Sequence, residues 1–149
     1  MQGAQEILLV DDNPADISLA QEALSECKRH NNRQLKISSV VDGEQAVDFL
    51  FRRGKYANQV RPDLVILDLN LPKKDGRAVL KEVKSDPDLC RIPVVIFSTS
   101  QANNDIVRSY QLGANCYVTK PVSLKSYFAT LQSIEEFWFG LASLPQEGE

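Results

Sequence analysis

The sequence predicts a doubly wound α/β domain built on a five-stranded parallel sheet, with helices on both faces of the sheet. Two observations predict this architecture. Short apolar runs alternate along the chain with segments in which apolar residues recur at helical spacing, and such strand–helix repeats are typical of parallel sheets. In addition, four of the apolar runs lead into reactive polar groups, as expected where parallel strands deliver side chains to one edge of a sheet.

The apolar runs are the predicted strands, and they cover residues 6–10, 36–41, 64–68, 94–98 and 116–119. Asn13-Pro14 opens the first predicted helix, because proline is favoured at the first helical position, and a polar turn at 29–33 ends it. Asp42-Gly43 starts the second helix, which is followed by a rather long loop at 53–62. The later helices are predicted to run to about residue 85, over 104–112 before Gly113, and over about 124–140.

Composition and charge exclude several classes of function. With a net charge of −3 and a pI near 5.2, the whole molecule should not attract nucleic acid. No apolar run approaches the roughly 20 residues of a membrane span, and the N-terminus lacks a secretory signal, so a cytoplasmic protein is expected. The odd count and wide spacing of Cys27, Cys90 and Cys116 favour reduced, mostly buried thiols over a disulfide framework or a metal site.

The length fits a single domain over residues 1–149, with its core over about 5–140 and a frayed tail at 141–149. We expect no attached output domain, because the chain ends soon after the last predicted helix.

Polar side chains at the ends of the predicted strands are the candidate functional residues: Asp11, Asp12, Asp68, Ser98 and Lys120. In the flavodoxin-like strand order 2-1-3-4-5, the first and third strands are neighbours about 4.8 Å apart at the topological switch point. The three carboxylates could therefore share one cation, and all five groups could surround one small anion.

Three clustered carboxylates do not all stay ionised unless a pKa rises or a cation binds. Oxygen ligands favour a hard cation, and Mg²⁺ that keeps some of its waters is the expected one. Asp68 could then attack phosphorus in line to give an acyl phosphate, with Lys120 offsetting charge and Ser98 donating to a phosphoryl oxygen. Each group alone also fits a helix cap, a turn or a solvated side chain, but their joint placement at successive strand ends favours the functional interpretation.

These residues carry a resemblance to the response-regulator receiver domain of two-component signalling, which covers about residues 5–140 in family order and spacing. The matching motifs are Val10-Asp11-Asp12-Asn13-Pro14, Leu67-Asp68-Leu69-Asn70-Leu71-Pro72, Asp75-Gly76, Ser98, Gly113-Ala114 and Lys120-Pro121. By this resemblance Asp68 is the phosphoacceptor. Asp12 binds Mg²⁺ directly, Asp11 acts through water, and Asn70 offers its backbone carbonyl to the metal.

The resemblance also implies a switch. Ser98 matches the switch hydroxyl, Tyr117 the switch aromatic and Lys120 the family lysine, whose bond to Pro121 is expected to be cis. Thr99 departs from the very small residue that is usual after the switch hydroxyl, which would narrow access to the acyl phosphate.

A narrower resemblance concerns the partner. The loop around 54–61 and the ending Ile134-Glu135-Glu136-Phe137-Trp138 with Leu144-Pro145 look like stand-alone regulators, a group that includes partners of phytochromes. The implied partner is a sensor histidine kinase, in this group a phytochrome, that passes a phosphoryl group from phosphohistidine to Asp68. His30, the only histidine of this chain, lies in the polar turn and is expected to be solvated, so it is a poor phosphodonor.

The last predicted helix carries more apolar residues than one sheet contact requires. The apolar residues from Leu124 to Ile134, together with Trp138, are predicted to form the side of the helix that faces the core. Around the helix axis, Phe137 lies nearly opposite this side, and Leu141 lies between Phe137 and the core-facing side. Local packing of a chain end is one interpretation. The favoured one is a homodimer through an aromatic face of this helix, formed by Tyr127, Phe137, Trp138 and Leu141.

Two other functions compete with the phosphoacceptor switch. An adaptor that works without phosphorylation is the second choice. An aspartyl phosphatase is less favoured, because such enzymes carry a carboxylate two residues after the nucleophile, where this chain has Asn70. We therefore expect no enzyme beyond self-phosphorylation from phosphohistidine and slow self-hydrolysis.

Overall fold

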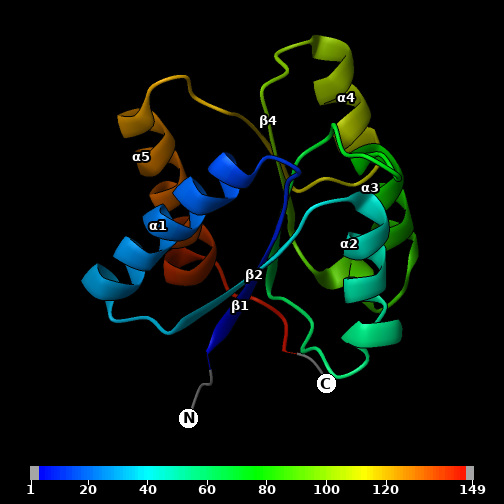
Figure 1. Ribbon diagram of the computed structural model, residues 1–149, viewed down its shortest axis with the longest axis horizontal. Coiled ribbons are helices and arrows are strands. Elements are labelled where there is room, and N and C mark those ends of the chain that lie inside the picture. Colours follow the sequence, from blue (N-terminus) through cyan, green and yellow to red (C-terminus); the bar gives the residue numbers. More distant parts are fainter. Residues whose placement is uncertain (1–3, 147–149) are drawn as a thin grey trace.

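The computed structural model describes residues 4–146, apart from the side chains of residues 28–31. Within these residues, five strands form one parallel sheet in the order β2-β1-β3-β4-β5, which confirms the predicted topology (Figure 1). The strands are β1 (Gln5–Val10), β2 (Leu35–Val40), β3 (Leu64–Leu67), β4 (Val94–Ser98) and β5 (Cys116–Thr119).

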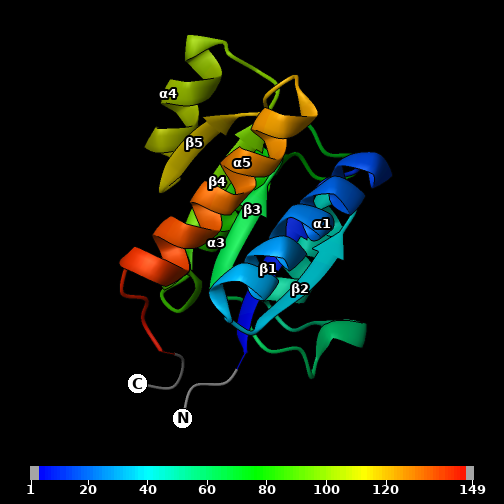
Figure 2. The ribbon, with the colours of Figure 1, turned by 90° about the vertical axis from the view of Figure 1, so that its left-hand side faces the viewer.

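Helices cover both faces of the sheet. They are α1 (Pro14–Asn31), α2 (Gly43–Leu50), α3 (Gly76–Ser85), α4 (Asn103–Gln111) and α5 (Leu124–Glu135). In Figure 1 and Figure 2, α1 and α5 lie side by side on one face, and α2, α3 and α4 lie on the other. In the described part of the chain, none of the helices has both the length and the apolar character that crossing a bilayer takes.

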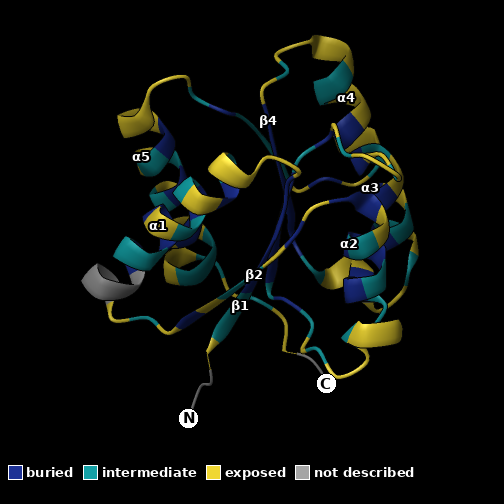
Figure 3. Cartoon of the chain, viewed as in Figure 1, coloured by how far each residue is buried: buried dark blue, intermediate teal, exposed yellow. Residues whose placement is uncertain are grey.

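Two hydrophobic cores, one on each face, hold the layers together. Along β1, Leu8 and Val10 point into the core beneath α2 and α3, whereas Ile7 and Leu9 point into the core beneath α1 and α5. All four are at most 3% exposed, and Figure 3 shows the sheet buried between the helix layers. This alternation fixes the strand register, because a slip of one residue would exchange the two sets of side chains.

Side-chain caps begin most of the helices where the sequence predicts. The Asn13 side chain accepts hydrogen bonds from two N–H groups in the first turn of α1. Asp42, Asp75 and Ser123 cap α2, α3 and α5 in the same way. These caps fix the residues at which α1, α2, α3 and α5 begin.

α1 is longer than predicted. The segment expected to turn at 29–33 continues the helix to Asn31, and Asn32 ends it with a left-handed φ of 55°. Asparagine tolerates this conformation at a helix C-terminus better than most residues do. The backbone of His30 is therefore helical, and the expected solvation of its side chain lies outside the described residues.

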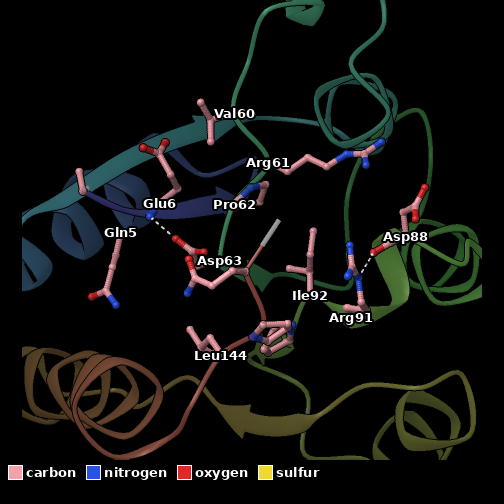
Figure 4. Close-up of a pocket in the computed structure, with 14 residues that line it drawn as sticks. Gln5, Glu6, Val60, Arg61, Pro62, Asp63, Asp88, Arg91, Ile92 and Leu144 are labelled. Atoms are coloured by element: carbon pink, nitrogen blue, oxygen red, sulfur yellow. Dashed lines mark hydrogen bonds between the residues drawn. The ribbon is translucent and has the colours of Figure 1, made fainter. Parts of the chain in front are cut away.

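The C-terminal segment also differs from the prediction. α5 ends as an α-helix at Glu135 and continues as a π-helical turn over Glu136–Leu141. Of the predicted frayed tail, residues 144–146 lie beside the start of β1 and the segment before β3, where they line a cavity of about 340 Å³ (Figure 4). Residues 147–149 lie outside the described residues.

The predicted aromatic face of the last helix is corrected by the structure. Phe137 and Leu141 are 48% and 76% exposed, and Trp138 is half-buried with its ring centroid 5.0 Å from that of Phe137. Tyr127 is only 6% exposed, because its ring packs in the core between α5 and the sheet, so its assignment to a partner surface was wrong. Leu124 was expected to face the core but is 59% exposed in the first turn of α5.

The thiols differ in their surroundings. Cys27 is buried, Cys116 is half-buried and Cys90 is exposed, all as free cysteines. Burial raises the pKa of the Cys27 thiol to about 11, so this side chain stays protonated at neutral pH.

We expect Gly43→Ala to destabilise the fold, because the start of α2 lies against the loop after β3. A Cβ atom at position 43 would lie 1.8 Å from the carbonyl oxygen of Lys74, and the Gly43 N–H donates to the carbonyl of Pro72 at 3.3 Å. The backbone would have to shift, so the free energy of unfolding in urea should fall by about 3 kcal/mol.

Gly54→Ala is the matched control for this change. Gly54 has a φ of +57° but nothing lies within 4 Å of its Cβ position. Strain alone should therefore cost about 1–2 kcal/mol there. An equal fall in the free energy of unfolding in both variants would show that the close approach at Gly43 does not contribute to stability.

Candidate functional site

The carboxyl ends of the strands form one edge of the sheet, and the candidate residues lie along it. Val10 of β1 is paired with Leu67 of β3, so the next residues, Asp11 and Asp68, are neighbours. The Asp68 N–H donates to the carbonyl of Val10 at 2.9 Å. The chain leaves β1 and β3 toward opposite faces of the sheet, so this edge is the predicted switch point.

Three carboxylates meet at this point. Asp11, Asp12 and Asp68 each offer an oxygen atom, and these oxygens lie within 4.8 Å of one another. Asp11 is buried, Asp68 is half-buried and Asp12 is exposed, so the cluster is open to solvent on one side. An oxygen-only donor set that is partly open fits a hard divalent cation that keeps some of its waters.

The electrostatics of Asp11 favour an added cation. Burial is the largest influence on the carboxyl group and raises its pKa, and the neighbouring Asp68 acts in the same direction. Hydrogen bonds from Lys120 and from the Asn13 N–H, at 2.7 and 2.9 Å, oppose this rise without cancelling it. A bound cation would stabilise the charged carboxylate directly.

Lys120 lies inside the acidic cluster. Its side chain is 5% exposed, and its Nζ donates to Oδ2 of Asp11 at 2.7 Å, of Asp16 at 2.9 Å and of Asp68 at 2.9 Å. Burial alone would lower the pKa of Lys120, but the hydrogen bonds to three carboxylates outweigh burial and raise it. The ammonium is therefore charged, and it occupies the position expected for a group that faces the phosphoacceptor.

Asp16 belongs to this site and was missed in the sequence analysis. The candidate residues lie at strand ends, whereas Asp16 lies in the first turn of α1. Side chains in a helix tilt toward its N-terminus, so a first-turn carboxylate on α1 points back to the edge of the sheet. Because Asn13-Pro14 marks the start of this helix in the sequence, an acidic residue just after it could have been predicted to point toward the site.

The loop after β3 places Asn70 beside the phosphoacceptor candidate. The Asn70 N–H donates to Oδ1 of Asp68 at 3.4 Å, while Oδ2 of Asp68 accepts from Lys120. Asn70 is exposed, and the metal-binding role of its carbonyl stays a prediction.

The two switch candidates meet at Ser100. Ser98 is fully buried, and its hydroxyl accepts a hydrogen bond from the Ser100 N–H at 3.2 Å. The Tyr117 hydroxyl donates to the carbonyl of the same residue at 2.9 Å. Ser98 and Tyr117 are therefore linked by hydrogen bonds through one residue of the β4–α4 loop. Thr99, which lies between Ser98 and Ser100 in the sequence, is exposed.

The same loop is tied to α3 and α4. The Ser100 hydroxyl donates to the Asp105 carboxylate in the first turn of α4, and Arg77 in α3 donates to the other oxygen of that carboxylate. These two hydrogen bonds lower the pKa of Asp105, the one from Ser100 contributing most. Asp105 is thus ionised at neutral pH and links the loop to two helices.

The bond between Lys120 and Pro121 is trans, so the expected cis conformation was wrong. The trans form is intrinsically favoured for X–Pro bonds, by about 0.5–1 kcal/mol. In this conformation Lys120 already reaches its three carboxylates.

Comparison with known proteins identifies a family and close relatives. Residues 7–132 match the model of the response regulator receiver domain. Response regulator Rcp1 of Synechocystis sp. is 48% identical over 139 residues, which cover 93% of this chain and 92% of Rcp1.

Two solved structures extend this likeness to the fold. The phosphorylated cyanobacterial phytochrome response regulator RcpA aligns with a TM-score of 0.92 and 51% identity over 97% of this chain and 100% of RcpA. The Mn²⁺-bound form of Rcp1 aligns with a TM-score of 0.88 and 46% identity, over 95% of this chain and 99% of that structure. The shared fold, the acidic edge with its buried lysine and the family match agree, and the chain belongs to the response-regulator receiver domains of two-component signalling.

Proposed function

We propose that this protein is a phosphoacceptor switch in which Asp68 takes a phosphoryl group from a phosphohistidine of a sensor histidine kinase in the cytoplasm. The observation that carries the proposal is the Lys120 ammonium 2.9 Å from Asp68, beside carboxylate oxygens that lie within 4.8 Å of one another. A buried cation and a metal-ligand set beside one nucleophilic carboxylate supply the positioning and charge stabilisation on which phosphoryl transfer depends.

The residues divide the chemistry among them. A carboxylate oxygen of Asp68 forms the bond to phosphorus, while the P–N bond to the donor imidazole breaks and its electron pair stays on the leaving nitrogen. Lys120 offsets charge on the phosphoryl oxygens. Asp11, Asp12 and Asp68, with the carbonyl of Asn70, would hold Mg²⁺, which when bound neutralises the phosphoryl group and orients it.

Phosphorylation is then transmitted through Ser100. When the Ser98 side chain rotates so that its hydroxyl donates to a phosphoryl oxygen, its Oγ moves away from the Ser100 N–H, from which it accepts at 3.2 Å in this structure. Tyr117, which donates to the Ser100 carbonyl, follows the loop. We propose that this shifts the population of the β4–α4 loop and α4 rather than creating a new fold.

A phytochrome is the kinase partner that the relatives support. RcpA is a cyanobacterial phytochrome response regulator, and the two proteins share 51% identity over nearly their full lengths. A bacteriophytochrome response regulator also aligns, with a TM-score of 0.74 and 39% identity over 96% of this chain. We propose the same class of partner for this chain.

We further propose a homodimer through the C-terminal part of α5 and its π-helical turn. An open hollow of about 340 Å³ there is lined mainly by apolar side chains, including Cys116, Val118, Ile134, Phe137 and Trp138. Exposed aromatic side chains beside an apolar hollow favour a protein interface. The fully buried Glu135 accepts from Arg33 at 2.6 Å, which ties this segment to the start of β2 and holds the surface in place.

Asp68→Asn should abolish phosphorylation, because the amide is not a nucleophile toward phosphorus. Incubation with acetyl phosphate and Mg²⁺ should add the mass of one phosphoryl group to the wild-type protein and none to this variant. Asp88→Asn is the control, since Asp88 is exposed at the opposite edge of the sheet. Steady turnover of an added phosphoester would instead indicate a phosphatase.

Asp12→Asn should weaken Mg²⁺ binding by about 10–100-fold, which is the usual effect of disturbing a metal site. The phosphorylation rate should show the same loss at subsaturating Mg²⁺ and recover in part at high Mg²⁺. Chelation by EDTA should stop phosphorylation of the wild-type protein. Phosphorylation that persists after EDTA treatment would contradict a metal-dependent site.

Phe137→Ser should shift a dimer toward monomer in sedimentation equilibrium at tens of micromolar protein, because it removes an exposed anchor from the hollow. Val122→Ser, which removes a fully exposed apolar side chain outside the hollow, should leave the equilibrium unchanged. A wild-type monomer at this concentration would exclude the proposed dimer.

A further inference from the structure

Asp16 touches the catalytic lysine but is not part of the metal-ligand group. Its Oδ2 lies 2.9 Å from Lys120 Nζ, whereas the carboxylates whose oxygens cluster within 4.8 Å are those of Asp11, Asp12 and Asp68. We infer that Asp16 is a positioning residue that holds the Lys120 ammonium in place for phosphoryl transfer. The inference rests on the proposed function.

The donors of Lys120 are matched one to one by carboxylates. An ammonium carries three N–H donors, and Asp11, Asp16 and Asp68 accept at 2.7, 2.9 and 2.9 Å. Asp11 and Asp68 also belong to the metal-ligand group, and Asp68 is converted to an acyl phosphate in the reaction. Asp16 has neither task, so its contact with Lys120 does not compete with metal binding or with acyl phosphate formation.

Asp16 is itself held firmly. The Tyr127 hydroxyl donates to its backbone carbonyl at 3.1 Å, and the Asn13 side chain accepts from its N–H at 3.4 Å. Tyr127 is 6% exposed and its ring centroid lies 5.3 Å from that of Phe97, over which the Lys120 ammonium lies at 5.9 Å. The backbone of Asp16 is thus held by the cap of α1 and by α5, beside the core that also supports the lysine.

A simpler role for Asp16 is stabilisation of α1, since acidic residues in the first turn interact favourably with the helix dipole. That role predicts a change in stability without a change in phosphoryl transfer. It also does not require an oxygen at the particular point that Lys120 contacts. A measurement of the phosphorylation rate therefore distinguishes the two roles.

The test is the initial rate of phosphorylation by acetyl phosphate with Mg²⁺, followed by intact mass. In this reaction the bond from Asp68 to phosphorus forms as the bond from phosphorus to the acetyl oxygen breaks, and acetate leaves with the electron pair. Asp16→Ala should slow the reaction about tenfold, because a misplaced catalytic group costs that much or more. Asp16→Asn keeps an oxygen acceptor at the same point and should restore the rate to within about threefold of wild type.

Two controls accompany these variants. Glu22→Gln makes the same charge change at an exposed position of α1 and should leave the rate unchanged. Mg²⁺ affinity, measured by calorimetry, should stay within about threefold of wild type in both Asp16 variants, because Asp16 is outside the metal-ligand group. Thermal unfolding confirms that each variant is folded.

Three outcomes would overturn the inference while leaving the proposed function intact. They are an unchanged rate in Asp16→Ala, a rate in Asp16→Asn as low as that in Asp16→Ala, and a parallel fall in Mg²⁺ affinity. The first leaves only the helix-stabilising role, the second indicates that charge rather than position matters, and the third makes Asp16 a metal ligand. Failure of the wild-type protein to be phosphorylated would instead overturn the proposed function, and the inference with it.

Discussion

The buried ammonium of Lys120 is the constraint on which the functional edge of the sheet depends. A charged group whose side chain is 5% exposed is costly unless it is paired, and three carboxylates supply the pairing. Those carboxylates would in turn repel one another without a cation between them. Each set of charges requires the other, so the ends of β1, β3 and β5 and the first turn of α1 are held together by one hydrogen-bonded group.

Two routes lead from this edge toward the surfaces that a partner can contact. One runs from Ser98 through Ser100 to Tyr117 and, by way of Asp105, to α4. The other runs from Lys120 through Asp16 to α5. Because α4 and α5 cover opposite faces of the sheet beside β5, the proposed phosphorylation of Asp68 would bear on both sides of this part of the molecule.

Much of the fold and of the site could be predicted from the sequence. Apolar runs of strand length alternating with helical spacing leave few topologies, because crossover connections between parallel strands are right-handed and strand ends share one edge. Asp11, Asp68 and Lys120 were found in this way, and the structure brings both carboxylates within hydrogen-bonding reach of the Lys120 ammonium. The family resemblance added the switch pair, Ser98 and Tyr117, which local pattern alone does not distinguish from structural residues.

The sequence by itself thus determined the element order, the buried strands and the strand-end chemistry, since these depend on local periodicity and on the polarity of neighbouring residues. Only the tertiary structure decided that Asp16 joins the site and that Tyr127 lies in the core rather than on a partner surface. It also decided that helix α1 continues to Asn31 and that α5 ends in a π-helical turn. The physical reason is that the environment of a helical side chain is set by what packs against its helix, and those contacts come from segments far away in the chain.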